Sequence, residues 1–380
     1  MSWRLSSFAL GPPDSARRLR QVYATPAPCA RRGSFCASLL VLAILTGCAA
    51  LNARATATPV VAGPTPSPAA TAFAKPTPTL APFRIDLPSQ YQPPVAGWRP
   101  PLYPVPWAVS PYDHFYFARP IAADQVNWPL ANYRYGGVFF ADVVHTGVDI
   151  DAPYGTKILA AGAGTVIWAD WGLFWKSPGL LTDPYGQAVV LRMDFGRQGK
   201  ALYSVYAHMS KIVALPGQHV ETGDVLGLVG DTGATTGPHL HFEVRWGKNS
   251  FESTYNPELW MAPPEGRGVL VGRITDTRNV TLDEWDVTVS NTATGQSHLV
   301  RTYSGDPANS DPYYDENLVI SDLPAGLYKV TFQYKDKDQQ EWMSIYPGQV
   351  TYFTFRGMAG FHVGLPGSSQ EAPTATPASP

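Results

Sequence analysis

The sequence predicts an all-β protein with two folded domains. Across residues 136–257, short alternating runs such as TKILAA, GTVIWA and AVVLRM are separated by glycines, and no long helical period occurs. A second series of alternating runs begins near Gly266 and has the turn spacing of a small β-sandwich. Because the 380 residues allow two domains of ~100 to 200 residues each, we expect one domain at 95–264 and a sandwich at 265–366.

The N-terminal part of the chain has the features of an export signal. Arg31 and Arg32 precede the apolar run FCASLLVLAILTG at 35–47, which suits a secretory signal and is shorter than the roughly 20 residues of a spanning helix. The sequence LTGC, which ends at Cys48, resembles the lipobox of bacterial lipoproteins, in which the cysteine is acylated. We interpret residues 1–47 as a lipoprotein signal peptide; the alternative is an ordinary signal peptide with a coincidental cysteine.

The amino-acid composition predicts the character of the segments outside the two domains and argues against a nucleic-acid partner. Residues 48–94 are dominated by Ala, Thr and Pro and predict an extended tether, and residues 367–380 predict a disordered tail. The formal net charge of −2 provides no basic field, so we expect no nucleic-acid partner. After signal cleavage Cys48 is the only cysteine, so the mature chain can form no internal disulfide.

Two histidines lie on one face of a predicted strand within TTGPHLHFEV. Polar and apolar residues alternate from His239 onward, so His239, His241 and Glu243 share one face of the strand. Alone, such a pair could be two solvated surface histidines. Glu243 could hydrogen-bond a metal ligand from outside, or it could be a solvated strand residue.

A second motif, HTGVDID, supplies further ligands for a metal. Asp149 follows His145 by four positions, which suits one face of a helix or a strand, and Gly147 with its β-branched neighbours favours a strand. A catalytic zinc takes three protein ligands and leaves a fourth position for water. His145, Asp149 and one histidine of the pair make such a set.

A third histidine and an aromatic loop complete the candidates. His208 lies in the strand-like run LYSVYAHM, where it alternates in phase with Leu202, Ser204 and Tyr206. The loop at 168–184 (WADWGLFWKSPGLLTDP) is either a wall of a substrate groove or a self-packed surface loop.

Together these motifs resemble the lysostaphin or LytM type of zinc metallopeptidase. The resemblance rests on HTGVDIDAPYGTKILAAGAGTV, YGQAVVL, YAHMSKI, GDVLGLVGDTGATTGPHLHFEV and YNP, which occur in the family's order. It implies a lysostaphin-type antiparallel β-sheet domain. It also implies that His145, Asp149 and His241 bind Zn²⁺ and that His208 and His239 act in catalysis.

The resemblance implies cleavage of peptide cross-links in bacterial peptidoglycan, and the signal, lipid anchor and tether would place the chain beside that polymer. We therefore predict a zinc metalloendopeptidase that is an exported, membrane-anchored lipoprotein at the cell surface or in the periplasm. One alternative is a catalytically silent wall-binding module that activates or positions another cell-wall hydrolase. Another is a zinc peptidase with a protein substrate.

The C-terminal runs DLPAGLYKVTF and IYPGQVTYFTF resemble the transthyretin-like, carboxypeptidase-regulatory β-sandwich domains. This resemblance implies a fold more than a function, and we see no cluster of metal ligands there. On the sequence alone, the sandwich is expected to affect mainly wall binding or placement, so a fragment ending near Pro264 is expected to retain zinc.

The lipobox predicts that Cys48 is the acylated residue. The wild-type protein should incorporate labelled fatty acid and partition into detergent, whereas Cys48→Ser should do neither, because a serine hydroxyl cannot replace the thiol that receives the lipid. Metabolic labelling of both proteins is the measurement, and equal labelling would exclude Cys48 as the site.

Overall fold

The computed structural model describes residues 95–140, 143–305 and 307–367. The predicted signal peptide at 1–47, Cys48, the tether at 48–94 and residues 368–380 of the tail lie outside the described residues. The regular structure in the described ranges consists of β-strands and short 3₁₀ helices, which confirms the all-β prediction. Within the same ranges, none of the helices has the length and apolar character that crossing a bilayer requires.

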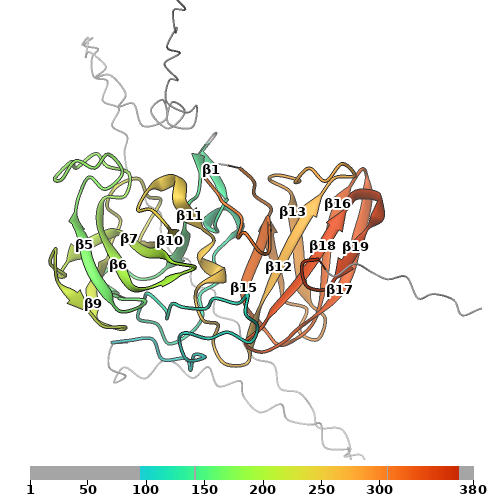
Figure 1. The fold of residues 1–380 in the computed structure, drawn as a ribbon, viewed down its shortest axis with the longest axis horizontal. Coiled ribbons are helices and arrows are strands. Elements are labelled where there is room, and N and C mark those ends of the chain that lie inside the picture. Colours follow the sequence, from blue (N-terminus) through green and yellow to red (C-terminus); the bar gives the residue numbers. More distant parts are fainter. Residues whose placement is uncertain (1–94, 141–142, 306, 368–380) are drawn as a thin grey trace, which may run out of the picture. The chain divides into compact units, whose positions relative to one another are not determined.

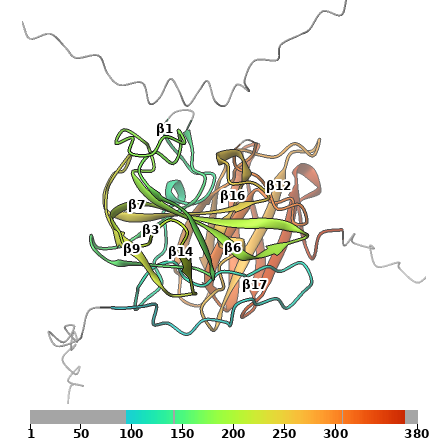
Figure 2. The same ribbon diagram turned by 60° about the vertical axis from the view of Figure 1, so that its left-hand side comes forward.

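The first module is built on a nine-stranded sheet with the order β11-β10-β7-β6-β5-β8, in which β3 also pairs with β10, β9 with β7, and β4 with β9 (Figure 1). A separate two-stranded sheet joins β1 and β2. Their bounds are β1 Val138–Phe140, β2 Val143–Val144, β3 Val148–Asp151, β4 Lys157–Leu159, β5 Gly164–Asp170, β6 Gln187–Arg197, β7 Lys200–Ile212, β8 His219–Val220, β9 Val225–Val229, β10 His239–Trp246 and β11 Thr254–Tyr255. The long β6–β7 pair stands out in the turned view (Figure 2).

The second module consists of two four-stranded sheets with the orders β15-β12-β18-β19 and β14-β13-β16-β17 (Figure 1). Neighbouring strands are antiparallel except β12 and β18, which are parallel. The bounds are β12 Arg267–Thr275, β13 Asp286–Asn291, β14 Ser297–Arg301, β15 Leu318–Pro324, β16 Gly326–Tyr334, β17 Lys337–Ile345, β18 Val350–Arg356 and β19 Phe361–Val363. The 3₁₀ helices are η1 Ala131–Tyr133, η2 Phe251–Ser253, η3 Pro257–Leu259 and η4 Gly357–Ala359.

The sheet β15-β12-β18-β19 is buried on both faces. Along β12, Leu270 and Ile274 enter the core between the two sheets of the sandwich, whereas Val269 and Val271 enter the core of the first module. Full burial of such a side chain contributes about 1.5 to 3 kcal/mol, so both faces stabilise the fold. Residues on both sides of the proposed boundary at 264/265 therefore share one hydrophobic core.

Candidate metal centre

The structure brings together His145, Asp149 and His241. Asp149 on β3 is the direct cross-strand partner of His241 on β10. His145 precedes β3 and lies outside any strand, so the predicted strand over 145–149 begins only at Val148. The residue between them must be small, because a Cβ atom on Gly147 would lie 2.5 Å from the Phe242 carbonyl oxygen and 2.8 Å from the His241 ring.

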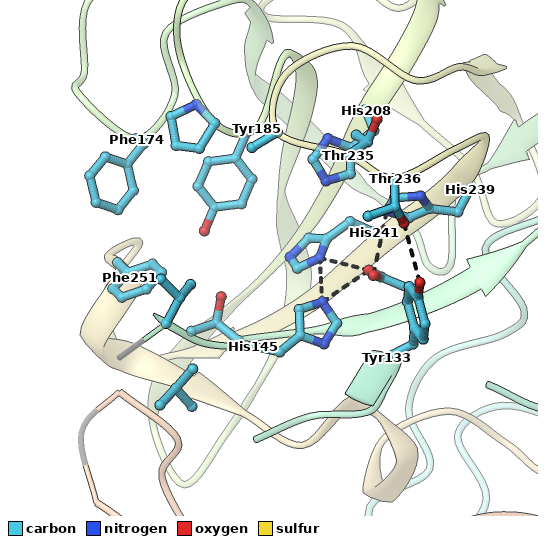
Figure 3. A pocket seen from close by; sticks show the side chains of 16 residues that line it. Tyr133, His145, Phe174, Tyr185, His208, Thr235, Thr236, His239, His241 and Phe251 are labelled. Carbon is cyan, nitrogen blue, oxygen red and sulfur yellow. Dashed lines mark hydrogen bonds and ion pairs between the residues drawn. The ribbon is translucent and has the colours of Figure 1, made fainter. Parts of the chain in front are cut away.

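Three ligand-type atoms converge at this point (Figure 3). His145 Nε2 lies 2.9 Å from Asp149 Oδ1 and 2.9 Å from His241 Nδ1, and His241 Nδ1 lies 3.0 Å from Asp149 Oδ1. Atoms with this spacing can all reach one ion at the roughly 2.0 to 2.2 Å that zinc prefers for nitrogen and oxygen. The geometry therefore suits a metal ion.

The outer partners of the two imidazoles determine where their protons lie. His145 Nδ1 is 3.0 Å from the Arg134 carbonyl oxygen, which can only accept, so Nδ1 donates and Nε2 keeps a lone pair when the ring is neutral. His241 Nε2 is likewise 3.1 Å from Glu243 Oε1, which leaves a lone pair on Nδ1. When both rings are neutral, three acceptor atoms therefore face one another, and a cation at their centre satisfies all three.

Glu243 is fully buried within a hydrogen-bond network, so it is not a solvated strand residue. Its Oε1 accepts hydrogen bonds from Thr146 Oγ1 at 2.6 Å, Tyr185 Oη at 2.6 Å and His241 Nε2. Its Oε2 accepts from Arg245 Nε at 2.8 Å. The carboxylate therefore orients the His241 ring by binding Nε2, and the other ring nitrogen, Nδ1, points to His145 and Asp149.

Charge at the centre shifts the titration of the groups around it. Burial alone would raise the pKa of Asp149, but the charge and hydrogen bonds of His145 and His241 hold it well below its usual range. Burial alone would lower the pKa of His241, but hydrogen bonds and charges from Asp149 and Glu243 raise it to about 9. The centre of the site thus strongly favours positive charge.

A β-bulge directs His208 into the site. Simple alternation along β7 would place His208 on the face of Leu202 and Tyr206, which lie in the hydrophobic core. Instead Gln187 pairs with Met209 and Val189 with Tyr206, so Ala207 and His208 together face one residue of β6, and His208 has φ 61°. The prediction that His208 shares a face with Leu202, Ser204 and Tyr206 is therefore wrong, because a bulge interrupts the period.

His208 and His239 lie beside the three converging residues (Figure 3). Their ring centroids are 4.8 Å apart, and His239 Nε2 is 3.5 Å from Asp149 Oδ2. Nδ1 of His208 bonds the Thr232 carbonyl oxygen at 2.8 Å, and Nδ1 of His239 bonds the Gly237 carbonyl oxygen at 2.8 Å. Burial, with the neighbouring histidines, lowers the pKa of His208 to about 3, and burial also lowers the pKa of His239. Both rings are therefore neutral near pH 7.

Aromatic side chains form the walls of the pocket around these histidines. Phe174, from the aromatic loop at 168–184, and Phe251 lie edge to face with ring centroids 5.3 Å apart. On the other side, Tyr133 Oη lies 3.2 Å from Thr236 Oγ1 (Figure 3). The aromatic loop thus contributes to the wall of the pocket through Phe174, while Leu181 in the same loop is exposed.

Sequence reasoning missed four residues that support the site, namely Arg134, Thr146, Tyr185 and Arg245. One signal was available for Arg245, which continues the polar face of His239, His241 and Glu243. Because every residue of β10 is buried, a charge on that face requires a partner. Thr146 and Tyr185 lie inside the motifs HTGVDID and YGQAVVL and Arg134 precedes them, but the spacing of these residues does not indicate that they support His145 or Glu243.

Comparison with known proteins finds similarity to peptidases over the region that contains this site. Residues 143–253 match the model of Peptidase family M23. The DD-carboxypeptidase/endopeptidase Mpg of Neisseria meningitidis is 33% identical over 126 residues, which cover 33% of this chain and 25% of the relative. The peptidoglycan DD-endopeptidase ShyA of Vibrio cholerae is 36% identical over 101 residues, 26% of this chain and 20% of the relative.

Two further proteins are similar over the same region. The murein hydrolase activator EnvC of Escherichia coli is 29% identical over 140 residues, 36% of this chain and 29% of the relative. The solved catalytic domain of lysostaphin from Staphylococcus simulans is 28% identical, with a TM-score of 0.28, over 33% of this chain and 86% of that one. The chain thus spans about a quarter of the length of the curated relatives it matches. The family match confirms the predicted resemblance to the lysostaphin or LytM type of peptidase.

The network predicts that Glu243 controls metal affinity through His241. In Glu243→Gln the carboxylate charge that orients the ring is lost, and zinc affinity should fall about 10- to 100-fold, the range typical of residues that hold a ligand from outside. Tyr185→Phe is the matched control, because it removes one donor to Glu243 but leaves the bond to His241. Chelator competition measures both variants, and unchanged affinity in Glu243→Gln would contradict this role.

Proposed function

We propose that the M23 domain of this chain is a zinc-dependent endopeptidase that hydrolyses peptide cross-links of bacterial peptidoglycan. The observation that carries the proposal is the convergence of His145, Asp149 and His241 on one point, with two neutral imidazoles directly beside it. This arrangement provides a ligand set and separate groups for proton transfer within one pocket.

His145 Nε2, Asp149 Oδ1 and His241 Nδ1 would hold the zinc ion. The two nitrogens carry lone pairs toward the ion because their opposite nitrogens donate to the Arg134 carbonyl and to Glu243. When bound, zinc would polarise the scissile carbonyl and lower the pKa of the attacking water. Three protein ligands leave a coordination position open for that chemistry.

His208 and His239 would move the protons of the reaction. Each ring holds its own proton on Nδ1 against a backbone carbonyl, so Nε2 of each is the proton acceptor. One ring would take the proton of the attacking water, and the proton would then go to the nitrogen of the leaving amine. A charged imidazolium beside the carbonyl oxygen would also stabilise the developing negative charge.

The relatives and the N-terminal sequence support a proposed substrate and location. Relatives are named for peptidoglycan DD-endopeptidase activity, and the signal at 1–47, Cys48 and the tether at 48–94 would hold the domain beside that polymer. We propose that the protein is an exported lipoprotein anchored to the membrane through Cys48. Mass spectrometry of defined muropeptides, digested with the soluble chain from about Gln90, tests both the reaction and the bond cleaved.

A second candidate function is activation of another cell-wall hydrolase, which the similarity to the murein hydrolase activator EnvC favours. An activator needs no intact metal site, whereas this chain has both a ligand trio and two flanking histidines. Cleavage of muropeptides by the purified chain alone supports the peptidase. Cleavage only when a second hydrolase is added supports the activator.

Removal of any one ligand should empty the site. We expect about one zinc per chain in the wild-type protein and little zinc in His145→Ala, Asp149→Ala or His241→Ala, because two ligands do not hold the ion against solvent. Elemental analysis of the purified variants measures zinc content. Full zinc occupancy in all three variants would show that the ligand set is wrong.

Removal of His208 or His239 should lower turnover and leave the metal in place. General acid–base catalysis contributes ~10²- to 10⁴-fold, so His208→Ala and His239→Ala should each lose at least about two orders of magnitude in rate. The double variant should lose less than the product of the single losses, because both rings act on one transition state. Zinc content and the rate on one muropeptide are measured together. Loss of zinc from His239→Ala, or near-normal turnover of His208→Ala, would contradict the division of roles.

A further inference from the structure

One segment, residues 128–137, lines the pocket and also supports the metal centre from behind. Its Tyr133 lies beside His145 in the pocket (Figure 3), and Trp128, Pro129 and Leu130 line the continuation of the pocket past His239. We call this stretch the 128–137 segment. It is one of the parts of the first module that connect the site with the C-terminal sandwich.

The end of the 128–137 segment orients His145, which no strand holds in place. The His145 amide donates to the Gly137 carbonyl at 2.8 Å, and the Gly136 amide donates to the His145 carbonyl at 2.8 Å. The side chain is bonded to the same turn, since His145 Nδ1 donates to the Arg134 carbonyl at 3.0 Å. The position of this turn therefore determines where His145 Nε2 points.

The sandwich in turn holds the 134–137 turn. The buried Arg134 guanidinium bonds Glu258 Oε2 at 2.5 Å, and the same oxygen accepts from the amide and the hydroxyl of Ser321 on β15, at 2.8 and 3.0 Å. Tyr135 Oη lies 3.3 Å from the Asn309 carbonyl, and its ring lies edge to face on Tyr303 at 5.2 Å.

Gly136 shows how closely the sandwich approaches this turn. The residue has φ 76°, in the left-handed region, and a Cβ atom on it would lie 2.2 Å from Tyr303 Cβ. No side chain can therefore stand between the turn and the sandwich at this point.

The start of the 128–137 segment rests on the same module. The Trp128 ring lies 4.4 Å from the ring of His298 on β14, and the Arg267 guanidinium on β12 lies 5.6 Å from the Trp128 ring. Arg301 on β14 donates to Asn132 Oδ1 at 2.8 Å. Contacts with the sandwich thus occur along the whole segment.

We propose that the C-terminal sandwich is a positioning element of the metal centre and of the pocket wall. It acts from Ser321 through Glu258 and Arg134 to His145, and through Trp128 and Asn132 to the wall. The proposal rests on the proposed zinc site and assigns the sandwich a role within the site itself. It predicts the opposite of the sequence-based expectation that the residues up to Pro264 hold zinc on their own.

The test uses the full chain and breaks the link at single positions. Glu258→Gln removes the charge that fixes Arg134, and zinc affinity should fall by up to about 10- to 100-fold. Ser321→Ala should lower the affinity less, because the Ser321 amide still bonds residue 258. The double variant should lose less than the product of the single effects if Ser321 acts through Glu258. Chelator competition gives the affinities, and the visible spectrum of the Co²⁺-substituted proteins reports the ligand geometry.

Asp322→Asn is the matched control. It weakens the buried ion pair between Asp322 and Arg119 in the same interface, next to Ser321, and its side chain makes no bond to the 134–137 turn. It should lower the melting temperature and leave zinc affinity and the Co²⁺ spectrum unchanged. An equal loss of zinc in Asp322→Asn, or unchanged affinity in Glu258→Gln, would overturn the positioning role.

Two further outcomes separate this proposal from the proposed function. If the wild-type chain binds no zinc, both fail. If the wild-type chain binds zinc and Ser321→Ala and Glu258→Gln bind it equally well with an unchanged Co²⁺ spectrum, only the positioning role fails. Should Glu258→Gln not fold, Ser321→Ala with its Co²⁺ spectrum decides the question alone.

Discussion

The site depends on one electrostatic constraint, namely that three acceptor atoms from His145, Asp149 and His241 lie 2.9 to 3.0 Å from one another. Acceptors this close repel one another unless a positive charge lies between them. The protein maintains the arrangement by binding the opposite side of each imidazole, through the Arg134 carbonyl and Glu243. The positive charge of the buried Arg245 in turn compensates the negative charge of Glu243. The buried charges around the three atoms are therefore paired as well.

Strand β10 shows how a buried strand can combine polar and apolar faces. Leu240, Phe242 and Val244 enter the hydrophobic core, whereas His239, His241 and Glu243 face the site. Burying these polar groups is favourable only when each finds a partner, which explains the dense network around Glu243. The same rigid strand thus carries one proposed ligand and one proposed proton-transfer group.

The sandwich contributes to the site through a sheet that is apolar on both faces. Because β12 directs Leu270 to one core and Val271 to the other, the sheet cannot separate from the first module without exposing apolar surface. The buried ion pair between Arg134 and Glu258 fixes the position of Arg134 more than it stabilises the fold. Desolvation of the two charges offsets much of their Coulombic attraction. This combination links the sandwich to the turn that orients His145.

The sequence by itself predicted the all-β class from strand alternation, and its local motifs predicted the resemblance to Peptidase family M23 and singled out His145, Asp149, His208, His239 and His241, because both signals are properties of neighbouring residues. The tertiary structure decided three other matters. The bulge at His208 depends on the register between β6 and β7, and the hydrogen bonds of Thr146 and Tyr185 to Glu243 depend on segments that are distant from β10 in the chain. The approach of Ser321 and Tyr303 to the 134–137 turn depends on the packing of two modules. Each is a contact between residues far apart in the chain, which the period of a single strand cannot encode.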